Sequence, residues 1–231
     1  MTSIPASLMA SLGTRILILL LSAFSVLTLS AVELLEGDLL FCLAESPNAI
    51  TDVTQGARGL PIDHVAIVHR IGGDEGLLYV IEAKKPTVCL TPIDTFWREN
   101  PRGLLICRVN ADVDIPKSVR RCLMMVGKPY DDLYLPGDSA IYCSELVQLN
   151  YVNSHGDLIF DPVPMSFHDA TGQITDYWQE FYAERGMTVP EGAPGSNPGE
   201  LSLRPQVTEV AYRLGDAIVR PDASLYKKTG H

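Results

Sequence analysis

Runs of apolar residues in the first half of the chain have the length and composition of β-strands. They cover residues 37–43 (GDLLFCL), 63–70 (DHVAIVHR), 77–83 (LLYVIEA), 88–90 (VCL) and 104–109 (LLICRV). The glycines and acidic residues of IGGDEG separate the second run from the third. Because such residues form turns, these two runs are predicted to pair as a hairpin.

The second half of the chain changes to a helical periodicity. Apolar residues recur at helical spacing within residues 115–127, 143–152 and 174–186. Thr91 and Pro92, in TPIDTFW, suit the N-cap and the first position of a further helix. Strands followed by helices predict an α+β domain, with an antiparallel sheet packed against helices.

The N-terminal segment has the pattern of an export signal. Arg15 precedes an uncharged apolar run from Ile16 to Ala31, which is shorter than the roughly 20 residues that cross a bilayer and ends in small residues. This predicts a signal peptide over residues 1–31 and export to the periplasm or the cell exterior. An uncleaved membrane anchor is the alternative, because Leu29 departs from the small residue preferred near the cleavage site.

The composition of the chain argues against some classes of function. The chain has 231 residues, of which 46% are hydrophobic, so it can bury the core of one compact domain. Its formal net charge is −10, which argues against nucleic acid as a partner. An acidic surface of this kind also serves solubility alone.

The five cysteines are scattered, without a CxxC pair, so no zinc ribbon or thioredoxin motif is present. An odd number leaves at least one thiol unpaired within an exported chain. Four of them lie in apolar strand-like or helical runs and are expected to pack as small hydrophobic residues: Cys42, Cys89, Cys107 and Cys122. Cys143 differs, because it stands where a short apolar run becomes a helix, and a helix start favours the nucleophilic thiolate.

A reactive cysteine needs a general base, normally a histidine that a third group orients. If Arg70 pairs with Gly76 across a five-residue loop, the hairpin register places His64 directly opposite Glu82. Directly opposed side chains share a face of the sheet, with Cβ atoms about 4.5–5.5 Å apart, so the imidazole could bond the carboxylate. A slip of one residue would separate them.

Other residues near these positions have simpler explanations. Glu145 is an alternative acid, but it follows Cys143 by two residues on one helix and is better suited to capping or a surface pair. His69 lies on the other strand face from His64 and is expected to be structural. Asp131 and Asp132, in GKPYDDLY, are expected to form a loop that shapes the cleft.

Five motifs occur in order between Gly37 and Tyr151: GDLLF, DHVAIV, YVIEA, GKPYD and YCSELV. Together they resemble the YiiX-like, circularly permuted branch of the NlpC-type papain-like cysteine peptidases and amidases, in which the histidine precedes the cysteine. The resemblance implies a permuted papain-like catalytic domain over residues 32–190, without a cofactor, followed by a Pro/Gly-rich C-terminal extension over residues 191–231.

The resemblance also implies roles for site residues. Cys143 would be the nucleophile, His64 the base and Glu82 the orienting residue. Tyr142 and Ser144, which flank the cysteine, are candidates for binding substrate or the oxyanion. A zinc ion held by the first three residues is the metal-dependent alternative, but no compact ligand spacing supports it, and no metal is expected.

These residues predict an exported thiol hydrolase that cleaves an amide of a cell-wall peptide or an amino acid through a thioester intermediate. An acyl-lipid hydrolase or acyltransferase with the same triad is one alternative. A protein of the cell envelope that binds a peptide or amino acid in the same cleft without turnover is the other. A reactive thiol would separate the enzymes from the binding protein.

Overall fold

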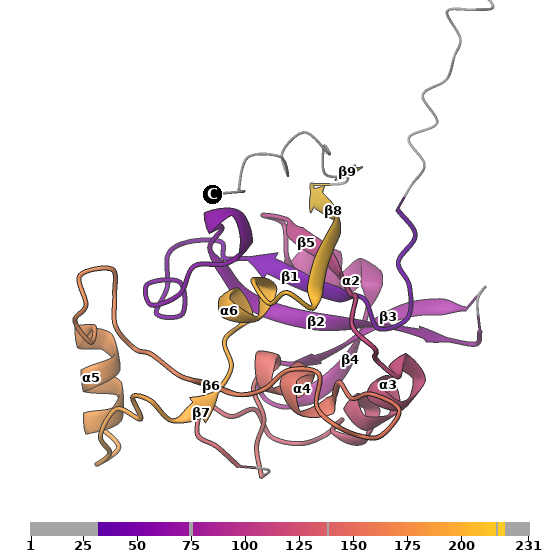
Figure 1. Cartoon of the computed structure of the whole chain (residues 1–231). Coiled ribbons are helices and arrows are strands. Elements are labelled where there is room, and N and C mark those ends of the chain that lie inside the picture. Colours follow the sequence, from indigo (N-terminus) through magenta and orange to yellow (C-terminus); the bar gives the residue numbers. More distant parts are fainter. Residues whose placement is uncertain (1–31, 74–75, 138, 216, 220–231) are drawn as a thin grey trace, which may run out of the picture. The chain divides into compact units, whose positions relative to one another are not determined.

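An antiparallel sheet organises the chain, in the strand order β4-β3-β2-β1-β5-β8-β9 (Figure 1). The computed structural model describes residues 32–73, 76–137, 139–215 and 217–219. Within these ranges the sheet consists of β1 (Leu39–Leu43), β2 (Ile62–Ile71), β3 (Leu77–Ala83), β4 (Val88–Pro92), β5 (Leu104–Val109), β8 (Val207–Leu214) and β9 (Ala217–Val219).

Helices follow the early strands along the chain, as the change in periodicity predicts. They are α2 (Ile93–Glu99), α3 (Ile115–Met124), α4 (Cys143–Asn150), α5 (Asp176–Ala183) and α6 (Pro198–Ser202), with a 3₁₀ turn η1 (Ala57–Gly59). The strand β6 (Val163–Pro164) precedes α5 along the chain, and β7 (Pro194–Gly195) follows it. The two strands pair as a short antiparallel ribbon. The predicted α+β class, an antiparallel sheet packed against helices, is confirmed.

Both faces of the central strands are buried, which explains why these strands read as nearly continuous apolar runs. Successive side chains of a strand point to opposite faces. One face packs with α3 and α4 through a cluster that includes Leu39, Phe41, Val65, Ile67, Ile81, Leu146 and Val147. The other face packs with α2 through a cluster that includes Leu40, Cys42, Ala66, Val68, Val80 and Phe96.

The predicted hairpin between β2 and β3 is present, but its predicted register is wrong. Arg70 pairs with Leu78 instead of Gly76, because β2 continues to Ile71 and closes the hairpin on Leu77. This register lies two positions from the predicted one. Since side chains alternate with a period of two, Glu82 keeps the face predicted for it and becomes a diagonal neighbour of His64.

The predicted N-cap at Thr91 is also wrong. Thr91 belongs to β4, and the N-cap of α2 is Pro92, which offers no side-chain cap. The Thr91 hydroxyl instead donates a hydrogen bond to Glu82 at 2.5 Å. The strand β4 therefore includes the residue that was predicted to cap the helix, and the Thr91 side chain faces the buried Glu82 carboxylate.

The segment predicted as a C-terminal extension supplies parts of the same compact unit. β8 pairs with β5 inside the main sheet, and α6 packs against β1 and β2. The polar, turn-rich character of residues 191–206 hides this role in the sequence.

The predicted signal peptide, residues 1–31, lies outside the described residues. Among the residues that the structure describes, no helix is long and apolar enough to span a bilayer.

Candidate active site

Cys143 is the first residue of α4, and its side chain is almost fully buried. The backbone is extended at Tyr142, and the first helical hydrogen bond runs from the Leu146 N–H to the Tyr142 carbonyl. The amide groups of the first turn precede that bond and have no partner within the helix. They leave a partial positive charge beside the Cys143 sulfur, as the helical pattern of CSELVQLN predicts.

Glu145 completes the start of this helix. Its carboxylate lies close to the Tyr142 backbone N–H, in the position that the return bond of a capping box takes. Burial raises its pKa to about 8, with a further contribution from the charge of Asp131, so the carboxyl group is mostly protonated at neutral pH. A neutral capping group is a poor partner for an imidazolium, which removes Glu145 as the alternative acid of the site.

The predicted hydrogen bond between His64 and Glu82 is present. His64 Nε2 donates to Glu82 Oε2 at 2.8 Å, and the glutamate is only 2% exposed. Thr91 and Lys84 bind the other carboxylate oxygen, Lys84 at 2.9 Å. Burial acts to raise the pKa of Glu82, but the bonds from His64, Thr91 and Lys84 outweigh it and lower the pKa to about 2.

Cys143 lies close enough to His64 to raise the pKa of its imidazole. Since Glu82 occupies Nε2, Nδ1 is the ring nitrogen left for the sulfur. Burial alone would lower the pKa of His64, but the hydrogen bonds and negative charges of Cys143 and Glu82 raise it to about 10. The imidazolium form of His64 is thereby favoured across the neutral range.

A β-bulge lies beside His64, whose partners come from two layers of the fold. Cys42 pairs with His64, whereas the next residue of β1 pairs with Ile62, so Asp63 is the extra residue of the bulge. His64 lies on the sheet face of α2, with its ring 6.4 Å from that of Phe96, while Cys143 belongs to the core on the opposite face. The bulge lies at the start of β2, directly before His64, and interrupts the strict alternation of side chains there.

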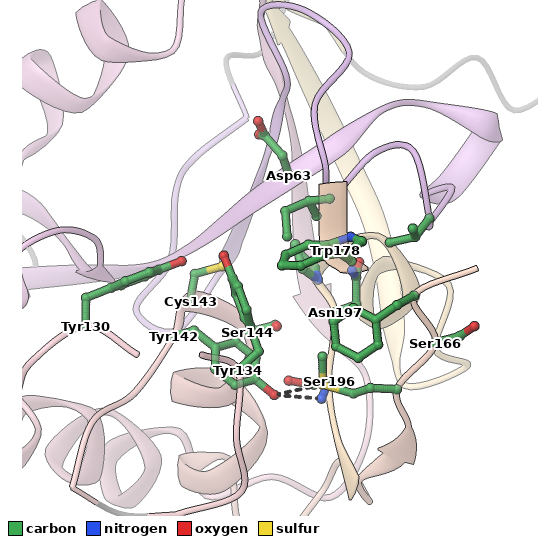
Figure 2. Close-up of a pocket in the computed structure, with 15 residues that line it drawn as sticks. Asp63, Tyr130, Tyr134, Tyr142, Cys143, Ser144, Ser166, Trp178, Ser196 and Asn197 are labelled. Atoms are coloured by element: carbon green, nitrogen blue, oxygen red, sulfur yellow. Dashed lines mark hydrogen bonds between the residues drawn. The ribbon is translucent and has the colours of Figure 1, made fainter. Parts of the chain in front are cut away.

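A small cavity of about 30 Å³ opens beside Cys143 (Figure 2). Its wall is mostly apolar and aromatic, and Asp63 is the one charged side chain among the described residues that line it. The lining residues are Ile50, Val53, Asp63, Tyr130, Tyr134, Tyr142, Cys143, Ser144, Met165, Ser166, Phe167, Trp178, Ser196, Asn197 and Pro198.

Two tyrosines of this wall were not predicted as site residues. Figure 2 shows the Tyr130 hydroxyl pointing toward the Cys143 sulfur, and Tyr134 lies close enough to Tyr130 to affect its pKa. Burial raises the pKa of both phenols, to about 12 for Tyr134, so both remain hydrogen-bond donors. Tyr134 has a φ of 52°, which is rare for a bulky residue and is typical of functional loops.

The loop that carries these tyrosines is shaped by Asp131, as predicted. Its carboxylate accepts the backbone N–H groups of Leu133 and Leu135 at 2.8 and 2.9 Å. The prediction for Asp131 is therefore confirmed, whereas the sequence did not identify the preceding Tyr130 as a residue of the cavity wall.

Tyr142 and Ser144 were predicted to contact the substrate or the oxyanion. The Tyr142 hydroxyl accepts the Ser196 N–H at 3.0 Å and donates to the Met165 sulfur at 3.5 Å, which ties two parts of the cavity wall together. Ser144 is fully buried, and its Oγ has no hydrogen-bond partner among the described residues. Direct contact of either residue with substrate stays a prediction.

The structure also shows the surroundings of His69 and of the four cysteines outside the site. His69 binds Glu36 at 2.8 Å on the opposite strand face from His64, in agreement with its predicted structural role. All five cysteines are free thiols, and three of the four outside the site are buried. In the part of the chain that the structure describes, no group of three or more His, Cys, Asp or Glu side chains has the geometry of a metal site.

The fold and the site together define a class, the papain-like hydrolases in permuted form, in which the sheet histidine precedes the helix-start cysteine. Comparison with known proteins agrees. Residues 33–210 match a family described as permuted papain-like amidase enzyme, YaeF/YiiX, C92 family, and the chain belongs to this family. It is therefore a hydrolase of the cysteine peptidase and amidase type.

A solved structure shares the fold. The crystal structure of a protein described as metalloprotein yiiX, from Escherichia coli O157:H7, aligns with a TM-score of 0.63 over 78% of this chain and 97% of its own, at 22% sequence identity. No curated protein matches the chain.

Proposed function

We propose that this protein is a thiol hydrolase that cleaves an amide of an apolar acyl group, with Cys143 as nucleophile, His64 as acid and base, and Glu82 as the orienting residue. One observation carries the proposal: the helix-start thiol lies beside a histidine that a buried carboxylate holds, and it lines an apolar cavity. A base bonded to the nucleophile and oriented by a third group is what covalent catalysis requires.

The reaction follows from these contacts. His64 takes the thiol proton, and the Cys143 sulfur attacks the substrate carbonyl to form a C–S bond. The C–N bond then breaks, the departing amine takes the proton from His64, and a thioester remains. Water gives a proton to His64 and attacks the thioester, which releases the acid and returns the proton to the sulfur.

The tetrahedral intermediates carry a negative oxygen, and two donors can reach this region. The backbone N–H of Cys143 belongs to the unpaired first turn of α4, and the Tyr130 hydroxyl points toward the sulfur. Preorganised donors at the developing oxyanion typically supply a large share of the rate enhancement. We assign Tyr142 a supporting role, because its hydroxyl already bonds Ser196 and Met165.

The cavity wall favours an uncharged acyl group. Phe167, Trp178 and Met165 supply apolar surface, whereas Asp63 would repel a carboxylate. A cavity of about 30 Å³ holds only about two or three waters, so an acyl chain has to displace flexible side chains such as Met165. These features favour an apolar acyl chain over a carboxylate-rich cell-wall peptide.

A series of anilides tests this proposal. Acyl groups from acetyl to dodecanoyl, with succinyl as the carboxylate-bearing counterpart, are compared for the wild type, Cys143→Ala and the matched control Cys89→Ala. We expect kcat/KM to rise with chain length and to be lowest for succinyl, only Cys143→Ala to lose activity, and mass spectrometry to find a thioester on Cys143. A preference for succinyl would overturn the substrate class, and activity in Cys143→Ala would overturn the mechanism.

Two further outcomes bear on the alternatives. Tight binding of an acyl amide without turnover or adduct would identify a binding protein. A rate that a chelator abolishes would identify metal-dependent chemistry, whereas an unchanged rate is expected for the thiol mechanism.

Export is also part of the proposal. It is supported by the apolar run from Ile16 to Ala31 and its small-residue end. The intact mass of protein recovered from the periplasm or medium should lack about 31 residues, as this pattern places the cut. Full-length chain in the membrane fraction would instead indicate an anchor.

A further inference from the structure

Lys84 lies directly beyond the end of β3 and links Glu82 to α2. Its Nζ is 2.9 Å from Glu82 Oε1 and 2.7 Å from Glu99 Oε2. The Lys84 side chain is about one-third exposed, and Glu99 is about half exposed. The lysine thus connects a buried carboxylate of the site to one at the surface.

The two oxygens of Glu82 are divided between different partners. Oε2 accepts His64, while Oε1 accepts the Thr91 hydroxyl and contacts Lys84. These partners come from three elements, β2, β4 and the end of β3. Rotation of the carboxylate would break several bonds at once, so its orientation toward His64 is fixed.

The charge of Lys84 has a separate purpose, which follows from the proposed reaction cycle. His64 alternates between imidazolium and neutral imidazole as it takes and gives protons. When His64 is neutral, Glu82 remains a buried carboxylate, and such a charge is costly without a cation. Lys84 is the cation in contact with it at every stage.

We propose that Lys84 is a positioning residue of the site, which keeps Glu82 oriented and charge-compensated while His64 is neutral and so makes the imidazolium a better proton donor to the leaving amine. Glu99 holds Lys84 in this place. The inference rests on the proposed roles of Cys143, His64 and Glu82.

Electrostatics gives the sign of the expected effect. Removing a cation next to the His64–Glu82 pair favours the imidazolium and therefore raises the pKa of His64. A less acidic imidazolium protonates an amine leaving group less readily. Among the described residues, the other titratable groups around the pair are Asp63, Glu45, Glu99, Cys42 and Cys143.

The first test is an NMR titration of His64 in a Cys143→Ala background, which removes the thiolate. We expect Lys84→Met to raise the pKa of His64 by about half a unit to one unit, because Lys84 is partly exposed and its charge is partly screened. Lys84→Arg should stay near the parent value. Lys85→Met is the matched control, since its partner is Asp132 at the surface.

The second test is kinetic. Lys84→Met should lower kcat for an anilide roughly tenfold with KM changed by less than about twofold, and it should slow an ester with a good leaving group less. Lys84→Gln replaces Lys84→Met if the latter does not fold. A His64 pKa and an anilide-to-ester ratio that match those of Lys85→Met would overturn the proposal.

The two proposals fail separately. If Cys143→Ala retains activity, the proposed function is wrong, yet the titration still reports whether Lys84 acts on the His64–Glu82 pair. If Cys143→Ala is inactive and Lys84→Met resembles Lys85→Met, only the role of Lys84 is wrong.

Discussion

Strand β2 carries two histidines that each bond a glutamate, His64 through Nε2 and His69 through Nδ1, in different surroundings. His64 bonds Glu82 and His69 bonds Glu36, each at 2.8 Å. Glu82 is buried to 2% exposure, whereas Glu36 is 35% exposed and its second oxygen accepts the Arg70 N–H. The pair alone therefore does not identify an active site.

The difference lies in what each pair faces. The ring of His64 meets the Cys143 thiol, and its carboxylate is held by Thr91 and Lys84. His69 points to the opposite strand face, and its carboxylate is open to water. The His64–Glu82 pair is a candidate catalytic unit because it lies beside a nucleophile and its carboxylate is buried and fully bonded. The His69–Glu36 pair has neither feature.

The largest contrast is expected between the two histidines. His64→Ala should lower kcat/KM on an acyl anilide by roughly 10²- to 10⁴-fold, because it removes the general acid and base. His69→Ala should stay within about twofold of the wild type, because its pair is a partly exposed structural contact. Comparable losses in both variants would show that stability, and not chemistry, controls the rate.

A smaller contrast is expected between the two glutamates. Glu82→Gln should lower turnover roughly 10- to 100-fold, because an amide can still orient the ring but no longer stabilises the imidazolium. The basic limb of the pH–rate profile should also move down from the region near pH 10 set by the pKa of His64. Glu36→Gln should change neither quantity, and a shifted limb in that variant would contradict the comparison.

The thiols provide the next contrast. Iodoacetamide at mildly acidic pH should label Cys143 before the other four cysteines, and His64→Ala should slow this labelling roughly tenfold by removing the cationic partner. Burial raises the pKa of Cys42 and Cys107, and that of Cys122 to about 12, which protects them. Peptide mass spectrometry gives the order, and equal labelling of all five thiols would remove the basis for a nucleophile.

The last contrast concerns the pH dependence of stability. The pKa of His64 is raised from 6.5 to about 10, despite the opposing effect of burial, by Cys143 and Glu82. The stabilisation by the imidazolium is thus fully present below about pH 6.5 and is lost as the pH rises through about 10, at about 1.4 kcal/mol per unit of pKa shift. Urea unfolding of the wild type and His64→Ala should show a gap that narrows over this range, and a constant gap would mean that the imidazolium adds no stability.

Errors in the predicted elements had little effect on the predicted site, and the reason is geometric. The hairpin register was wrong by two positions, but a period of two preserves the face of every side chain. Thr91 was predicted to cap a helix, and its small hydroxyl serves equally well as a donor to a neighbouring strand. The contact between His64 and Glu82 required only that both side chains lie on the same face of the sheet. The alternation of side chains along each strand is enough to predict that.

The sequence by itself determined the α+β class, the helix that begins at Cys143, and the shared face of His64 and Glu82, because these follow from local periodicity. Only the tertiary structure decided that His64 lies beside Cys143 and that Tyr130 and Tyr134 enter the site. It also decided that Lys84 completes the carboxylate network and that residues beyond 190 line the cavity. These features bring together segments that are distant along the chain. The pattern of residues within one segment does not determine which distant segment packs against it.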